Sequence, residues 1–123
     1  ADLTFGRQSV VDIDEQLIDK ITSQLEDDIL YFAWIAKIAR MQKPERNEAD
    51  CTKAVVDSVI KLHNDGIIVV GNAYQSDGMV LINPWPEENK ELRTRIESAI
   101  AKYNGSDDQN FCFWVQLAEH FAR

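Results

Sequence analysis

The sequence predicts an α+β fold, mostly helical, in which helices pack around a β-hairpin. Apolar residues recur three and four positions apart over most of the 123-residue chain, which indicates amphipathic helices. Only one part, residues 67–82, instead shows two short β-branched and apolar segments separated by a turn. A chain of this length fits one compact domain, residues 1–123.

The first two helices are expected over residues 10–25 and 29–41. In the first, one apolar stripe forms while the acidic residues fall mostly off it. The stripe consists of Val10, Ile13, Leu17, Ile21 and Leu25. The second is apolar on nearly every side, so we expect it at the centre of the core. Asp27 or Asp28 can cap it, and an unbroken helix through residues 26–28 is the alternative.

The third helix, residues 50–64, is followed at once by the predicted hairpin. Gly66 suits a left-handed residue at the helix C-terminus. Residues 67–74 and 79–82 then predict two strands, with a turn over residues 75–78 in which Gly78 permits a positive φ. A helix followed directly by a hairpin is typical of a winged-helix-like domain.

A fourth helix is predicted over residues 87–103, and the last segment is predicted as a helix as well. Ser106 to Gln109 matches a capping box, and the residues after it include Phe111, Trp114, Ala118 and Phe121 at helical spacing. The letters FCFWV, residues 111–115, also fit a short strand. Most of the aromatic residues are expected in the core. Trp85 lies between two prolines, so it is either a surface anchor for a partner or a lid over the core.

The chain has a formal net charge of −8, and the acidic residues concentrate near the start. Residues 1–28 contain eight acidic and two basic residues, a net charge of −6. Such a chain repels phosphate backbones and attracts basic partners. The predicted wing turn has no basic residue and contains Asp77, while Lys53 and Lys61 in the preceding helix are offset by acidic neighbours. Nucleic acid is therefore an unfavourable partner.

No catalytic, cofactor-binding or metal site is predicted, so the chain is not expected to be an enzyme. The two histidines, His63 and His120, accompany no serine or cysteine nucleophile signature. Neither they nor Cys51 and Cys112 have zinc-site spacing. We expect both cysteines to be reduced thiols in a cytoplasmic protein, since no secretory signal or membrane-spanning run is visible.

The stretch from Leu62 to Gly105 resembles small acidic bacterial proteins that carry the patterns GLVxVG and DGFxPW before a Glu-rich helix. The matching positions are residues 66–71, Asp77, Gly78 and Trp85. Proteins of this kind look like immunity proteins of bacterial toxin systems, including contact-dependent growth inhibition. The resemblance implies a protein that binds one cognate basic toxin domain, a nuclease, and blocks its active site.

The partner-binding residues expected from this resemblance and from the charge pattern come from the first helix, the helix junction and the Pro-flanked tryptophan. They are Asp12, Asp14, Glu15, Asp19, Glu26, Asp27, Asp28 and Trp85. The alternative is a winged-helix transcriptional regulator or adaptor. A small enzyme is a third possibility, for which the sequence shows no catalytic group.

Overall fold

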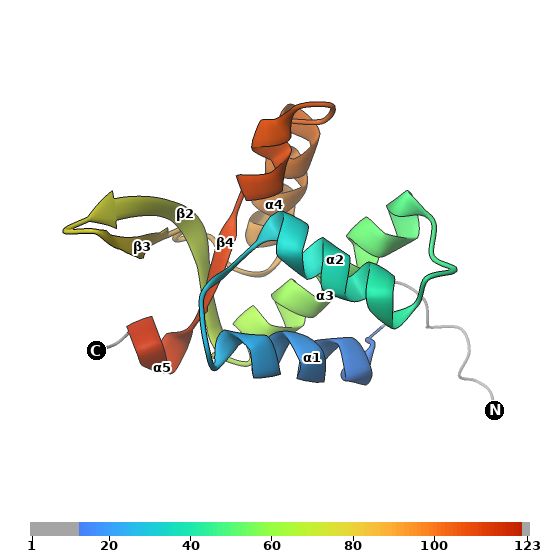
Figure 1. The fold of residues 1–123 in the computed structure, drawn as a ribbon, viewed down its shortest axis with the longest axis horizontal. Coiled ribbons are helices and arrows are strands. Elements are labelled where there is room, and N and C mark those ends of the chain that lie inside the picture. The colour runs from blue at the N-terminus through green and yellow to red at the C-terminus, as the bar shows by residue number, and fades with distance from the viewer. Residues whose placement is uncertain (1–12, 122–123) are drawn as a thin grey trace.

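The structure, a computed structural model, describes residues 13–121 and is an α+β fold that is mostly helical, as predicted (Figure 1). The helices are α1 (Glu15–Leu25), α2 (Phe32–Gln42), α3 (Glu48–Asn64), α4 (Asn89–Lys102), the 3-10 helix η2 (Asp107–Phe111) and the short α5 (Ala118–Phe121). The strands are β1 (Leu30–Tyr31), β2 (Ile68–Ser76), β3 (Met79–Pro84) and β4 (Trp114–Leu117). The hairpin and the preceding helix lie where the sequence predicts them.

The strands form one antiparallel sheet in the order β1-β4-β2-β3. The hairpin is therefore not an isolated wing, because its first strand also pairs with β4, which joins it to β1. Val70 lies opposite Val115, and Val115 lies opposite Leu30, so one buried row crosses three strands. This row is part of the hydrophobic core.

The prediction of one helix at the C-terminal end is wrong. Residues 107–111 form η2, residues 114–117 form β4, and only the last described residues are α-helical. The strand alternative for this segment is the better description. Val115 and Leu117 are buried while Trp114 and Gln116 are half-buried, which is the two-residue alternation of a strand.

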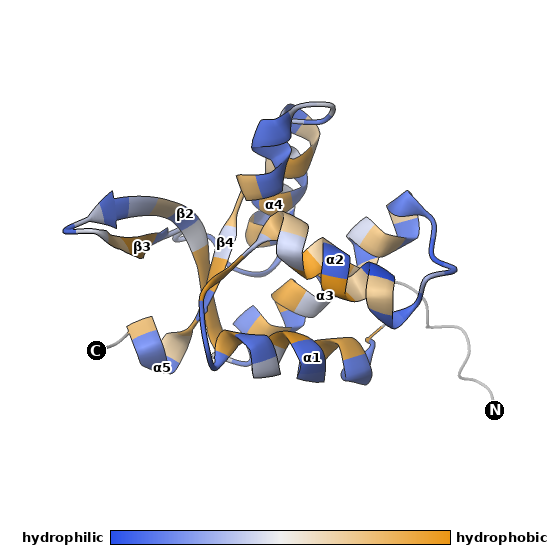
Figure 2. Cartoon of the chain, viewed as in Figure 1, coloured by the Kyte–Doolittle hydropathy of each residue, from blue (hydrophilic) through white to orange (hydrophobic). Residues whose placement is uncertain are grey.

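The stripe predicted for the first helix is confirmed over the described residues. Leu17, Ile21 and Leu25 are fully buried, and Figure 2 shows the polar residues of α1 on its outer side. The second helix begins at Phe32 rather than at residue 29, because Leu30 and Tyr31 extend as β1. Neither Asp27 nor Asp28 caps it.

The hairpin projects from the body of the molecule (Figure 1) and turns through Asp77 and Gly78. Both turn residues have positive φ, 53° and 77°, as a two-residue hairpin turn requires. The expectation of positive φ at Gly78 is confirmed. Gly66, after α3, has φ 77° and fits its predicted place at the helix end.

Candidate partner-binding site

The predicted acidic residues separate into groups with different roles. Asp12 lies outside the described residues. Asp14 is the N-cap of α1 and accepts the backbone N–H of Leu17 at 3.1 Å. Its carboxylate also binds the guanidinium of Arg46 at 2.7 Å and lies 3.9 Å from the Lys43 amine. Asp14 therefore has an internal structural role and offers little to a partner.

The environment of Asp14 changes its pKa. Burial raises the pKa, but the Leu17 N–H and the cations of Arg46 and Lys43 favour the charged form. The net effect is a pKa below the usual value, so the carboxylate is charged at neutral pH. A group held in this way stabilises the fold.

Glu15 and Asp19 are exposed on α1, and neither lines the hollow that contains Asp27 and Asp28. Asp19 lines a groove between α1 and α2 together with Lys20, Trp34 and Lys37. The groove therefore contains both positive and negative side chains, so its potential attracts a strongly basic partner only weakly.

Glu26, Asp27 and Asp28 are exposed where α1 leads into β1. None of the three forms an ion pair with any residue in the described part of the chain. One carboxylate oxygen of Asp28 accepts the N–H of Ile29 at 2.8 Å. These three acids thus keep most of their capacity for an external cation.

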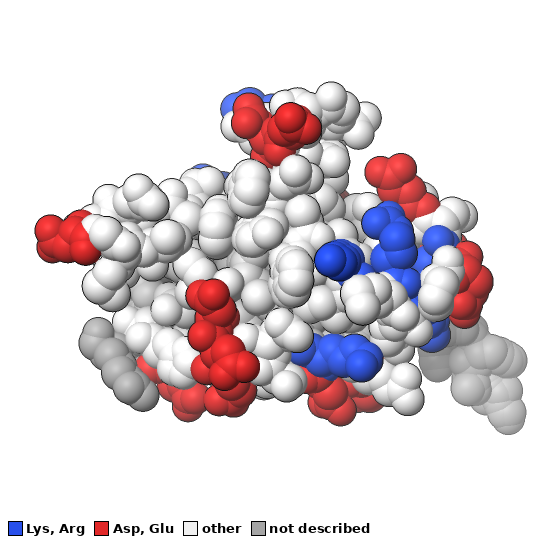
Figure 3. All heavy atoms as spheres, in the orientation of Figure 1, with Lys and Arg blue, Asp and Glu red and all other residues white. Residues whose placement is uncertain are grey.

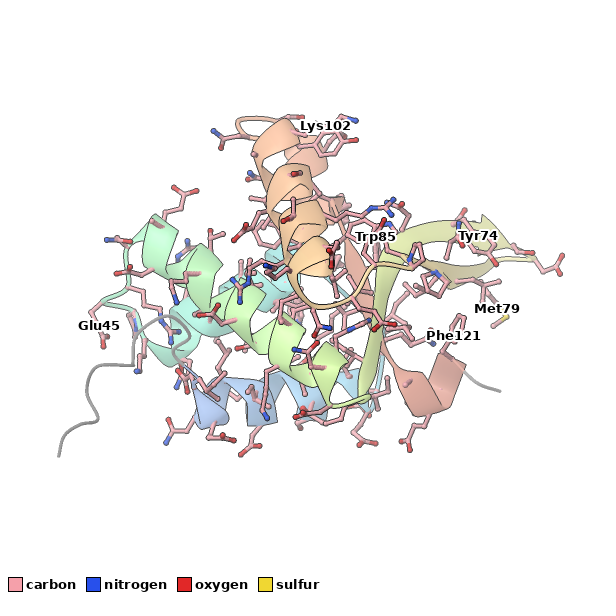
Figure 4. All side chains as sticks on the ribbon, turned by 180° about the vertical axis from the view of Figure 1, so that it is seen from behind. Glu45, Tyr74, Met79, Trp85, Lys102 and Phe121 are labelled. Carbon is pink, nitrogen blue, oxygen red and sulfur yellow. The ribbon has the colours of Figure 1, made fainter. Side chains whose placement is uncertain are left out.

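The prediction of Trp85 as a partner anchor is not supported, because its side chain is a lid over the core. Only 8% of the residue is exposed. Its indole N–H donates to the side-chain oxygen of Asn72 at 2.9 Å, and the guanidinium of Arg95 lies 4.4 Å from its ring centroid. Figure 4 shows Trp85 at the base of the hairpin, beside α4. Its backbone N–H is also bound, by the carbonyl of Val70.

Phe111 and Trp114, which the sequence predicted in the core, lie together with Tyr31 in an aromatic cluster on the outer side of the sheet. Tyr31 contacts Phe111 and Trp114, with ring centroids 4.7 and 5.1 Å away, and Phe111 stacks on Trp114 at 5.9 Å. Phe111 is 50% exposed, and the other two residues are half-buried. The alternation of WVQL places Trp114 opposite in direction to Val115, and this signal could have identified the cluster.

Two shallow hollows share Trp114 and Val80. One, which we call the Trp114 hollow, is lined by Asp27, Asp28, Ile29, Tyr31, Met79, Val80, Trp114, Gln116 and His120. The other lies on the far side of Trp114, between Phe111 and the β2 residues 72–75. The structure therefore brings two of the predicted acids, Asp27 and Asp28, against half-buried aromatic side chains and the exposed apolar residues Met79 and Val80.

The surrounding surface continues this pattern. Tyr74, Met79, Val80 and Phe121 are exposed large apolar residues, and Figure 4 shows three of them, Tyr74, Met79 and Phe121, around the hairpin end of the molecule. In Figure 3 the surface over β4 and the hairpin is largely uncharged, with acidic side chains at the hairpin tip and below it. Lys and Arg side chains gather at the opposite end, over α1 and α2.

The helix that a winged-helix protein would insert into DNA is covered. Every position from Val55 to Ile60 in α3 is buried, and six consecutive residues point in all directions around a helix. Helix α2 packs on one side of α3, and α4 lies across another side in Figure 4. Asp57 is only 2% exposed and binds Arg93 of α4 at 2.7 Å. This ion pair holds α4 against α3.

The cysteines and histidines form no recognisable catalytic arrangement in the described region. Cys51 and Cys112 are both free and buried. Burial raises the pKa of the Cys112 thiol to about 11, so the thiol stays protonated at neutral pH and is a poor nucleophile. The ligand atoms of Glu26, Glu119 and His120 lie within 4.8 Å of one another on the exposed surface. Exposed groups of this kind are common without a metal.

No helix among residues 13–121 has the length and apolar character needed to cross a membrane. Comparison of the chain with protein-family models, with curated proteins and with solved structures found no match in any of the three.

Proposed function

We propose that this chain is an immunity protein, which binds one basic toxin domain of a bacterial competition system and blocks its active site. The observation that supports the proposal is the position of Glu26, Asp27 and Asp28. None of the three has an ion pair within the described residues, and Asp27 and Asp28 line the hollow that contains Tyr31 and Trp114. Acidic groups of this kind accelerate association with a basic protein, while buried aromatic anchors supply affinity.

A toxin that cuts nucleic acid needs a basic cleft to hold phosphate groups. An acidic protein can occupy that cleft without any chemistry of its own. The net charge of −8 favours such a partner, and no internal ion pair at residues 26–28 has to be broken on binding. Because Trp85 is buried, we assign the role of partner-binding tryptophan to Trp114 instead.

The regulator alternative gains no support from the structure. Its recognition helix would be α3, which α2 and α4 cover, and its wing would be the hairpin with Asp77 at its tip. A carboxylate at the tip repels the phosphate backbone that a wing normally touches.

The proposal is tested with the toxin domain encoded next to the gene for this chain. The chain should protect cells that express this domain, and the purified proteins should form a complex whose dissociation constant rises with salt. Reversing the charge of two acids, Asp27→Lys with Asp28→Lys, should raise the dissociation constant at least about tenfold at low salt and flatten its salt dependence.

The matched control is Glu15→Lys with Asp19→Lys, which changes the net charge equally from the other part of the predicted set. It should weaken binding much less. Equal losses in both double variants would show that only net charge matters and would reject the surface at residues 27 and 28. Absence of any complex with the neighbouring toxin domain would reject the immunity function itself.

A further inference from the structure

The three tryptophans of the chain differ in whether a cation covers the ring. The amine of Lys37 lies 4.9 Å from the ring centroid of Trp34, and the guanidinium of Arg95 lies 4.4 Å from that of Trp85. Both distances are typical of cation–π contacts. Trp114 has no such partner in the described part of the chain.

The surroundings of Trp114 would suit a cation as well. Tyr31 lies beside it, with ring centroids 5.1 Å apart and planes inclined by 53°. Phe111 contacts both rings, and the side chains of Tyr31 and Trp114 both line the Trp114 hollow, which Phe111 does not. Asp27 and Asp28 line the same hollow. Aromatic rings and carboxylates together hold a cation more strongly than either does alone, because the ring faces and the carboxylates both favour positive charge.

No Lys or Arg of the described chain balances the negative charge of the hollow, and His120 is the one basic side chain that lines it. Neither Asp27 nor Asp28 has an ion pair, and no Lys or Arg lines the hollow. By contrast, the groove that contains Trp34 has Lys20 and Lys37 beside Asp19. The Trp114 hollow thus combines the aromatic side chains of Tyr31 and Trp114 with two carboxylates that no Lys or Arg of the described chain neutralises.

We propose that the Trp114 hollow receives an arginine side chain of the basic partner protein, with its guanidinium against the rings of Trp114 and Tyr31 and its N–H groups directed at Asp27 and Asp28. The inference rests on the proposed function and specifies how the partner is held. Arginine fits better than lysine, because a planar guanidinium can stack on a ring and donate to carboxylates at the same time. Nucleic acid does not fit, because its phosphates would face two carboxylates.

The probe is an acetylated, amidated peptide, Gly-Arg-Gly-Arg-Gly, compared with the same peptide in which citrulline replaces arginine. Citrulline keeps the planar shape of the side chain but has no charge. Titration is followed through the indole N–H resonances of the three tryptophans by NMR. The arginine peptide should shift the Trp114 resonance and leave those of Trp34 and Trp85 in place, and the citrulline peptide should bind at least about tenfold more weakly.

Two sets of variants test the residues. Trp114→Leu should abolish the peptide-induced shifts seen in the backbone resonances of residues 27–31. Since this change in β4 can disturb the sheet, the exposed pair Asp27→Asn with Asp28→Asn provides the second test and should weaken the peptide by about tenfold. The control pair Glu15→Gln with Asp19→Asn should leave peptide affinity within about twofold.

Equal binding of the arginine and citrulline peptides, a primary shift at Trp34, or full affinity in the Asp27/Asp28 pair would overturn the inference. These results are distinguishable from failure of the proposed function. If the arginine peptide binds at Trp114 but the neighbouring toxin domain forms no complex, the hollow is a cation site and the immunity function fails. If the toxin binds with equal affinity to the Asp27/Asp28 pair, the function stands and this inference fails.

Discussion

At the scale of single residues, Asp14 shows how one carboxylate from the predicted partner set stabilises the fold instead. It caps α1 through the N–H of Leu17 and binds Arg46, which follows α2. Asp14→Asn keeps a good cap but removes the charge, so it should lower the free energy of unfolding by about 1 kcal/mol. Asp14→Ala removes both and should cost about 2 kcal/mol. Urea denaturation at pH 7 measures both changes.

The pH dependence of the same variants gives a second check. Because the folded pKa of Asp14 is below its unfolded pKa of 3.8, its contribution is complete above that value and is lost as pH falls through the folded pKa. The difference in unfolding free energy between the native chain and Asp14→Asn should therefore shrink on acidification below that value. A difference that stays constant down to the acid limit would contradict the ion pair with Arg46.

Gly71 is required by a close approach of backbone rather than by its own φ. A Cβ at this position would overlap the carbonyl oxygen of Asn83 and come within 2.8 Å of the Pro84 Cα. Gly71→Ala should thus destabilise the chain by more than about 3 kcal/mol, because the rigid β2–β3 pairing must open. Thermal denaturation followed by circular dichroism measures the loss. Gly105→Ala, at positive φ but in open space, is the control and should cost only about 1 kcal/mol.

At the scale of elements, α4 depends on a buried ion pair with α3. Arg93→Ala removes the guanidinium from Asp57, whose carboxylate is almost completely buried and is also bound by Lys53. The loss should be about 2 kcal/mol and should appear as faster amide hydrogen exchange in α4. Lys90→Ala, an exposed change in the first turn of α4, should leave both measurements nearly unchanged. Similar effects of the two variants would show that the Asp57 contact does not hold α4.

The elements that the sequence predicted well are those specified by local patterns. The stripe of α1, the C-terminal glycine of α3 and the Asp77–Gly78 turn each depend on residues close together in the chain. Strand β1 has only two residues, and it exists because Leu30 and Tyr31 pair with β4, more than 80 residues later. Strand β4 was hidden by an accidental helical spacing of Phe111, Trp114, Ala118 and Phe121. Its pairing with both β1 and β2 determines its conformation.

The candidate site also combines features that depend on local sequence with features that depend on long-range strand pairing. The acidity of residues 26–28 was visible in the sequence, because it depends on composition alone. The position of Asp27 and Asp28 beside Trp114 was not visible, because it depends on the pairing of β1 with β4. Trp85 was misleading for a related reason: the flanking prolines suggested a surface position, whereas Asn72 and Arg95 hold the indole at the edge of the core.

At the scale of the whole molecule, the distribution of charge favours an immunity protein over a DNA-binding regulator. Basic side chains gather over α1 and α2, whereas the surface at the sheet end is largely uncharged, with acidic side chains at its borders (Figure 3). A DNA-binding domain needs its basic surface on the helix and wing that contact the duplex. Here residues 55–60 of α3 are buried and include no Lys or Arg, and the hairpin tip has Asp77, so neither the middle of α3 nor the hairpin offers such a basic surface.

The last prediction follows from this arrangement and concerns duplex DNA. In a mobility-shift titration at low salt, the chain should give no sequence-dependent retention of duplexes drawn from its own promoter region, because covering of α3 removes the surface for base contacts. The sensitised control is Arg93→Ala, which loosens α4 but adds no positive charge, and it should not gain affinity either. Suppose instead that retention depends on duplex sequence and is lost when Lys53 or Lys61 of α3 is replaced by Ala. This result would show that α3 is accessible to DNA and would support the transcriptional regulator. Retention without sequence dependence would instead be assigned to the basic surface of α1 and α2, and Lys37→Ala with Arg40→Ala should then abolish it.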